Sequence, residues 1–259
     1  MILFFTGTGN SQYLANRIGE KTNDRVISIT DALHEEKFNF IVSEGENLGF
    51  VMPVYFSGVP KAVKDFLKKA NFSLKGDNYV FSALTCGGLT SGTGKMLSSL
   101  LSQKGITVSA EYGIKMVDNY IYMYSISDEK EAIDVLKGAE DEIQKIALSV
   151  CEKKKGIMNS VHGPSVMTKF MYPLYKVFRK TKPFYVNGNC NGCGKCVSYC
   201  PKNLIKLVPV GTENLVLCSN NTQNLTTCDS LGKTEILSYP KKKGFKIWQS
   251  CYRLLNKIH

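Results

Sequence analysis

The stretch MILFFTGTGNSQYLANRIGEK, residues 1–21, joins a short apolar run, a loop of small residues and a periodic segment. The apolar run ends at Phe5, and Leu14, Ala15 and Ile18 then recur at the interval of one helix face. This order predicts a strand, a glycine loop and a helix.

The loop inside this stretch suits a phosphate. It brings backbone N–H groups, small hydroxyl side chains and a helix N-terminus to one point, through Thr6, Gly7, Thr8, Gly9, Asn10 and Ser11. Because it lacks the lysine of a P-loop, a phosphate monoester fits better than a nucleoside triphosphate. A tight turn that is merely rich in Gly and Thr is the alternative interpretation.

Strands and helices alternate along the first half of the chain. Further strands are expected at Val26–Ile29, Leu48–Met52, Tyr79–Thr85 and Ile106–Tyr112. Helical patterns cover Pro60–Ala70, Gly94–Lys104 and Asp128–Lys154. The alternation predicts an α/β fold with a parallel sheet covered on both faces, whose ligands bind beyond the carboxyl ends of the strands.

Two more loops follow expected strands at that edge. The loop after the third strand places two aromatic rings where a planar ligand can stack, and it contains Val54, Tyr55, Phe56 and Ser57. A packed Tyr–Phe core pair is the alternative. The loop after the fourth strand has glycines that let the backbone approach a ligand, and it contains Thr85, Cys86, Gly87 and Gly88.

The series FFTGTGNS, PVYFSGVPKAVKDFL and TCGG resembles a short-chain flavodoxin. The resemblance implies a doubly wound, five-stranded parallel sheet in the order 2-1-3-4-5 that binds FMN. It implies that residues 6–11 hold the FMN phosphate, residues 54–57 flank the isoalloxazine ring and residues 85–88 close its other side. The stretch MVDNYIYMY, residues 116–124, resembles a segment of flavodoxins fused to ferredoxins.

The second half of the chain carries a metal-binding pattern. Four of the nine cysteines lie within eleven residues and are followed by a proline: Cys190, Cys193, Cys196 and Cys200. This is the spacing of a bacterial ferredoxin run and predicts a [4Fe-4S] cluster, with a structural zinc site as the alternative. In a reducing compartment such clustering indicates metal rather than disulfides, and we expect a cytoplasmic protein.

A second run, CSNNTQNLTTC at residues 218–228, keeps only its outer cysteines. Aligned on the ferredoxin spacing, its inner positions are Asn221 and Asn224, which are poor ligands for iron–sulfur clusters. Because the fourth cysteine of one run ligates the cluster of the other, we predict one cluster, with two not excluded, held by Cys190, Cys193, Cys196 and Cys228. Closure by Cys200 or Cys251 and a coincidentally spaced loop are the alternatives.

We expect the chain to consist of two domains, a linker between them and a C-terminal tail. These are a flavodoxin-like FMN domain at 1–155, a helical linker at 156–183, a small α+β ferredoxin-like domain at 184–240 and a basic tail at 241–259. The linker contains a helix at about Ser165–Arg179 that Pro173 kinks or interrupts. The segment LIKLVPVGTENLVL between the two cysteine runs predicts a hairpin.

Charge divides the chain unevenly. Residues 1–150 hold 15 Lys and Arg against 18 Asp and Glu, a net of −3, whereas residues 151–259 hold 18 against 4, a net of +14. A basic half can indicate nucleic acid, anionic lipid or an acidic protein partner, and charge alone does not choose among them. The sequence has no nucleic-acid motif, and the resemblance to flavodoxins and ferredoxins implies a redox partner protein with an acidic docking surface. The tail could also contact an anionic membrane surface, but the apolar stretches are shorter than the roughly 18 residues of a membrane span.

In this domain order the chain resembles the flavodoxin-ferredoxin fusion proteins. The resemblance implies an electron-transfer flavoprotein that passes electrons between a 4Fe-4S cluster and FMN and exchanges them with partner proteins. An FMN-dependent reductase of a quinone, nitro compound or disulfide and a redox-responsive binding protein are alternatives. A carrier is favoured over an enzyme because none of the three histidines adjoins the expected FMN loops.

Overall fold

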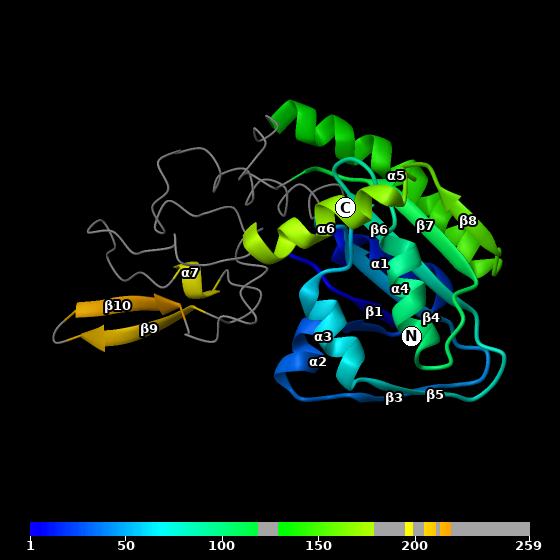
Figure 1. Cartoon of the computed structure of the whole chain (residues 1–259), viewed down its shortest axis with the longest axis horizontal. Helices are drawn as coiled ribbons and strands as arrows, with labels where there is room; N and C mark the ends of the chain where they lie inside the picture. The colour runs from blue at the N-terminus through cyan, green and yellow to red at the C-terminus, as the bar shows by residue number, and fades with distance from the viewer. Residues whose placement is uncertain (119–128, 179–194, 199–204, 211–212, 219–259) are drawn as a thin grey trace.

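The computed structural model describes residues 1–118, 129–178, 195–198, 205–210 and 213–218 and contains a parallel sheet between helices (Figure 1). The sheet order is β2-β1-β4-β6-β7-β8, with β1 paired in parallel to both β2 and β4. Its strands are β1 (Ile2–Phe4), β2 (Val26–Ser28), β4 (Leu48–Pro53), β6 (Val80–Cys86), β7 (Ala110–Lys115) and β8 (Gly156–Asn159). The predicted α/β class and the order of the first five strands are confirmed.

The sheet differs from the prediction at β7 and β8. β7 begins four residues later than expected, because the apolar Ile106 instead closes the end of α4 (Thr93–Ser102), where its N–H donates to the Leu101 carbonyl at 3.1 Å. β8 is a sixth strand, paired in parallel with β7. The sheet therefore continues beyond residue 155, where the sequence places the end of the domain.

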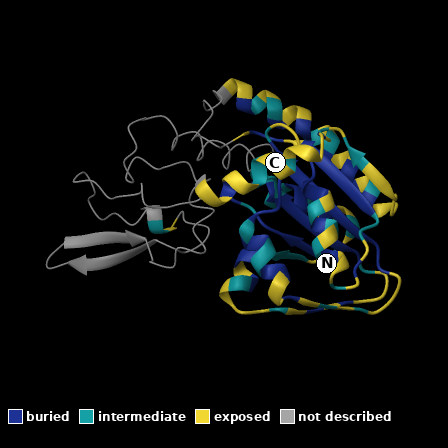
Figure 2. Cartoon of the chain, in the orientation of Figure 1, coloured by how far each residue is buried: buried dark blue, intermediate teal, exposed yellow. Residues whose placement is uncertain are grey.

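Successive residues of a strand point to opposite faces of the sheet and pack in two separate hydrophobic cores. Ile2 and Phe4 pack with α1 (Asn10–Thr22) and α5 (Glu129–Cys151) on one face of the sheet. Leu3 and Phe5 pack on the other face with α2 (Ile29–His34), α3 (Lys61–Lys69) and α4. Burial on both faces explains why the central strands β1, β4, β6 and β7 are mainly apolar and are almost entirely buried (Figure 2).

A second, two-stranded parallel sheet lies beside the main one. It pairs β3 (Asn39–Val42) with β5 (Asn71–Leu74) and was not expected from the sequence. The residues of β3 alternate between exposed and buried, and each strand has only four residues. Such short, half-buried strands give a weak periodic signal.

The predicted linker helix is present as α6 (Val166–Phe178). It continues through Pro173, so the expected interruption is not found. Tyr172 and Tyr175, on either side of the proline, both contact the sheet domain. The helix is thus continuous although proline has no N–H to donate within it, and it is tied to the sheet domain on both sides of Pro173.

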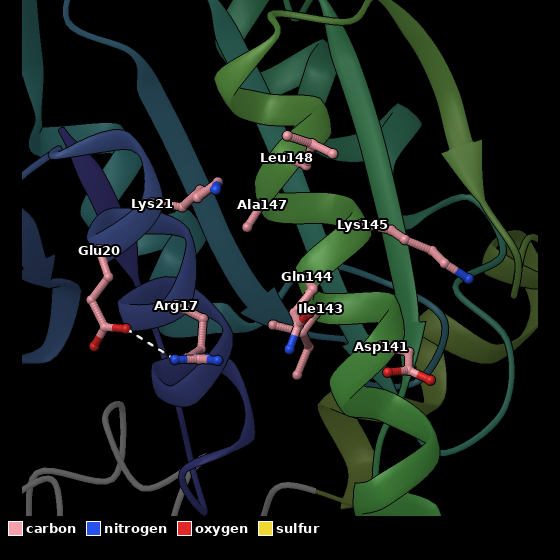
Figure 3. A pocket seen from close by; sticks show the side chains of 9 residues that line it. All are labelled: Arg17, Glu20, Lys21, Asp141, Ile143, Gln144, Lys145, Ala147 and Leu148. Atoms are coloured by element: carbon pink, nitrogen blue, oxygen red, sulfur yellow. Dashed lines mark hydrogen bonds and ion pairs between the residues drawn. The ribbon is translucent and has the colours of Figure 1, made fainter. Parts of the chain in front are cut away.

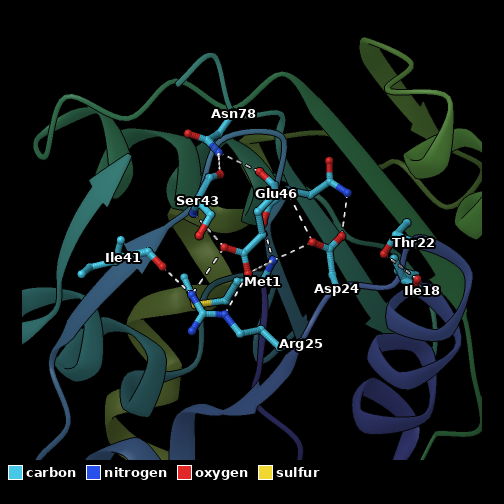
Figure 4. A network of polar contacts seen from close by, with 10 residues as sticks. Met1, Ile18, Thr22, Asp24, Arg25, Ile41, Ser43, Glu46 and Asn78 are labelled. Carbon is cyan, nitrogen blue, oxygen red and sulfur yellow. Dashed lines mark hydrogen bonds and ion pairs between the residues drawn. The ribbon is translucent and has the colours of Figure 1, made fainter. Parts of the chain in front are cut away.

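An ion-pair network closes the amino ends of the strands, with the side chains of Met1 and Asp24 buried and that of Arg25 exposed (Figure 4). The Met1 ammonium lies 2.8 Å from Asp24 Oδ1 and 3.0 Å from Glu46 Oε1, and Arg25 Nε lies 2.8 Å from the same Glu46 oxygen. Burial acts to raise the pKa of Glu46, but hydrogen bonds from Arg25, the Ser43 N–H and the N-terminus outweigh it and lower the pKa to about 2.

The second half of the chain contributes three described elements. These are α7 (Lys195–Ser198), β9 (Ile205–Val210) and β10 (Glu213–Cys218). β9 and β10 pair antiparallel with Cys218 opposite Ile205, which confirms the predicted hairpin. The tail at 241–259 lies outside the described residues.

Candidate functional site

Three loops meet at the carboxyl edge of the sheet, after β1, β4 and β6. The Val54 N–H donates to the Thr85 carbonyl at 2.9 Å, which joins the second loop to the third. Asn10 Nδ2 donates to the Val117 carbonyl at 3.0 Å, which joins the start of α1 to the segment after β7. The structure therefore brings the three predicted groups of site residues to one place.

The loop after β1 has the geometry of an anion site. Gly9, directly before α1, has φ 104°, a value that residues with a side chain rarely adopt. Its N–H donates to Thr6 Oγ1 at 3.0 Å, and its carbonyl accepts the first helical bond from Tyr13 at 2.8 Å. The first N–H groups of α1 have no acceptor within the helix, so this end of the helix suits a phosphate.

Ser11 has a different position from the rest of this loop. Its hydroxyl lies 2.7 Å from the Thr85 hydroxyl, and the two residues are only 1% and 2% exposed. The two hydroxyls form a hydrogen bond to each other in the protein interior. Their side chains thus join the first loop to β6, and Ser11 contributes its backbone N–H to the first turn of α1.

The loop after β4 contains a tight and strained turn. Tyr55 and Gly58 exchange both backbone hydrogen bonds at 3.0 Å, and Phe56 and Ser57 between them have φ of 50° and 56°. Two successive non-glycine residues in the left-handed region cost about 1–2 kcal/mol each. Strain of this kind persists only where surrounding contacts impose it, and such turns are concentrated at functional sites.

The aromatic rings of this turn pack against α6. The Tyr175 ring stacks on Phe56 with centroids 5.7 Å apart and lies 6.0 Å from the Tyr55 ring. Phe5 contacts Tyr55 edge to face at 6.3 Å. The packed alternative is therefore observed in part, but the partner of both rings is a tyrosine from a distant helix.

Helix α6 also holds the backbone of the turn, which the sequence did not reveal. Thr168 Oγ1 donates to the Ser57 carbonyl at 2.6 Å and accepts from the Gly92 N–H at 2.9 Å. Tyr172 donates its hydroxyl hydrogen to the Val59 carbonyl at 2.7 Å. The only available signal was the spacing of 168, 172 and 175, which places them on one helix face.

The loop after β6 contains a buried thiol and two glycines, of which one is crowded by a neighbouring side chain and the other is not. Burial raises the pKa of the Cys86 thiol to about 12, and its Sγ lies 3.3 Å from the Gly88 carbonyl. A Cβ on Gly87 would lie 2.6 Å from the Asp118 side chain, whereas one on Gly88 would meet no atom within 4 Å. Cys86 thus acts as a packed residue, and the exposed Gly88 leaves room for a ligand.

A pocket of about 620 Å³ lies between α1 and α5, away from these loops (Figure 3). Its lining has mixed charge and comprises Arg17, Glu20, Lys21, Asp141, Ile143, Gln144, Lys145, Ala147 and Leu148. Beside it Glu140 accepts from Arg17 and Tyr13, both at 2.7 Å, and burial with this contact raises the Tyr13 pKa to about 12. None of the predicted site residues lines this pocket.

The predicted cluster ligands fall mostly outside the described residues. Cys196 lies in α7, and Cys190, Cys193, Cys200 and Cys228 are in the part not described. Within the described ranges there is no group of three metal-ligating side chains and no helix able to cross a membrane. The ligand assignment therefore stays a prediction.

Two family models each match one segment of the chain. The model of the flavodoxin domain matches residues 1–105, and that of the 4Fe-4S binding domain matches residues 183–206. The first implies FMN, which fits the helix N-terminus after β1, and the second implies a 4Fe-4S cluster.

No curated protein matches the chain significantly. A solved structure of the Trp repressor binding protein from Bacillus subtilis is 12% identical, with 56% of this chain and 96% of that chain covered and a TM-score of 0.33.

Proposed function

Because the chain joins a flavodoxin domain to a 4Fe-4S binding domain, we propose that it passes electrons between the cluster and FMN within one molecule. FMN takes up one or two electrons and the cluster exchanges one at a time, so together they connect one- and two-electron partners. Keeping both in one chain removes the association step between separate carriers.

The position of α6 is the observation that carries this proposal. Tyr175 near its C-terminus stacks on Phe56 in the loop expected to flank the flavin ring. The helix ends at Phe178, and the 4Fe-4S match begins at residue 183. Five residue steps span at most about 18 Å, so the start of the iron–sulfur domain is tethered close to the flavin loop.

The residues proposed to bind FMN are those of the three loops. Residues 6–10 and the backbone of Ser11 hold the phosphate at the N-terminus of α1. Residues 54–57 and 85–88 lie at the same sheet edge and flank the isoalloxazine ring. The exposed Gly88 permits close approach, while the neutral Cys86 thiol supports the loop from within.

For the cluster we propose the ligands Cys190, Cys193, Cys196 and Cys228. The described hairpin of β9 and β10 supports this choice because it separates the two cysteine runs as a ferredoxin-like hairpin would. Anaerobic reconstitution of Cys228→Ala and Cys200→Ala variants tests the assignment. We expect cluster loss only in Cys228→Ala; loss in Cys200→Ala alone would refute it.

The partner proposal follows from charge. The net +14 of residues 151–259 favours a redox protein with an acidic docking surface. Rapid electron exchange with such a partner, slowed by added salt, is the expected result. Turnover of small acceptors with NAD(P)H, without electron exchange with a protein, would instead favour a reductase.

A further inference from the structure

The strained turn at Phe56 and Ser57 is held from outside the segment that matches the flavodoxin domain. That match ends at residue 105, whereas the contacts to the turn come from α6 at 166–178. A turn with two non-glycine residues at positive φ needs external support to remain in one conformation.

Three side chains on one face of α6 supply that support. The Thr168 hydroxyl bridges the Ser57 carbonyl and the Gly92 N–H, and so joins the turn to the start of α4. The Tyr172 hydroxyl donates to the Val59 carbonyl just after the turn. The Tyr175 ring stacks on Phe56, and its hydroxyl oxygen accepts from the Lys61 N–H at 3.3 Å.

Helix α6 packs so closely on the turn and on the start of α4 that both of these segments require a glycine facing the helix. A Cβ on Gly58 would lie 2.1 Å from the Tyr172 ring, and one on Gly92 would lie 2.8 Å from Thr168 Oγ1. The Lys64 ammonium lies over the Tyr172 ring, 5.2 Å from its centroid, in a cation–π contact. This packing fixes both the helix and the turn in a single arrangement.

We propose that Thr168, Tyr172 and Tyr175 are positioning residues that preorganise the flavin loop. The inference rests on the proposed function, since it concerns the loop that flanks the FMN ring. The three residues act through the backbone of residues 57–59 and through Phe56, and need not touch the flavin. The helix that leads to the iron–sulfur domain thereby also sets the binding geometry for FMN.

The test uses the full chain and compares wild type with Thr168→Val, Tyr172→Phe and the double variant. Lys169→Gln, an exposed neighbour on α6, is the matched control, and Thr168→Ser retains the bridging hydroxyl. FMN affinity is measured by fluorescence titration, the midpoint potential of bound FMN by anaerobic titration, and the melting temperature without FMN.

We expect the FMN Kd to rise about 3- to 10-fold in each single valine or phenylalanine variant, more in the double variant, and to recover in Thr168→Ser. The flavin potential should shift in the double variant because oxidised and reduced FMN meet a changed loop. A Kd within twofold of the control, or a lower melting temperature without a shift in potential, would overturn the positioning role. Wild type that binds no FMN would overturn the proposed function as well.

Discussion

Replacing Gly58 with Ala should displace α6 from the loop after β4. The new Cβ would lie 2.1 Å from Tyr172 Cδ2 and 2.5 Å from Cε2, so the ring must move. Overpacking of this kind costs about 1–3 kcal/mol, and loss of the Tyr172 hydrogen bond to Val59 costs about 1 kcal/mol more. The expected destabilisation is about 2–4 kcal/mol, or about 4–16 °C in melting temperature.

The assay is thermal unfolding of the FMN-free protein, with Gly88→Ala as the control. Gly88 lies in the neighbouring loop, and a Cβ there would meet no atom within 4 Å, so its effect should stay within about 0.5 kcal/mol. If Tyr172 causes the clash, Gly58→Ala should cost little in a Tyr172→Ala background. Equal melting temperatures for the two glycine variants, or an undiminished cost in that background, would refute the packing of α6 on this loop.

Two further predictions concern stability. Gly94→Ala should destabilise the protein by about 1–3 kcal/mol in urea unfolding, although alanine favours helices, because its Cβ would lie 1.8 Å from Oε2 of the buried Glu111. Gly138→Ala is the control in α5, where the space is open, and it should stabilise the protein by about 1 kcal/mol. Equal effects of the two substitutions would contradict this reasoning. Because the pKa of Glu46 is lowered from 4.5 to about 2, its contribution of about 3 kcal/mol is complete above about pH 4.5 and is lost as the pH falls towards 2. Unfolding titrations of Glu46→Gln should show lower stability at pH 7 and a weaker acid dependence in that window, and an unchanged acid dependence would reject the assignment to Glu46.

The sequence predicts well what depends on local pattern. Strands β1, β4, β6 and β7 are mainly apolar because helices cover both faces of the sheet. The loop at residues 6–11 is recognisable because Gly9 must adopt a positive φ. The cysteine run is likewise local, and its spacing alone identifies the 4Fe-4S match at 183–206. Each of these features depends on residues that are close together in the sequence.

Features that depend on tertiary packing could not be predicted in the same way. β8 has four residues and begins with a glycine, and it becomes a strand only because β7 offers an open edge. The contact of Thr168 with Ser57 joins residues 111 positions apart. The hydrogen bond between the Ser11 and Thr85 hydroxyls is similarly long-range. It places the Ser11 side chain in the interior, although the loop pattern made every residue from 6 to 11 look equally suited to phosphate.

Anaerobic stopped-flow mixing with a substoichiometric reductant tests the central claim most directly. Cluster and flavin absorbance are followed as electrons redistribute between the two cofactors, over a tenfold range of protein concentration. Transfer within one chain predicts a first-order rate that does not change with protein concentration. A rate proportional to protein concentration, or cofactors that never exchange electrons, would contradict it.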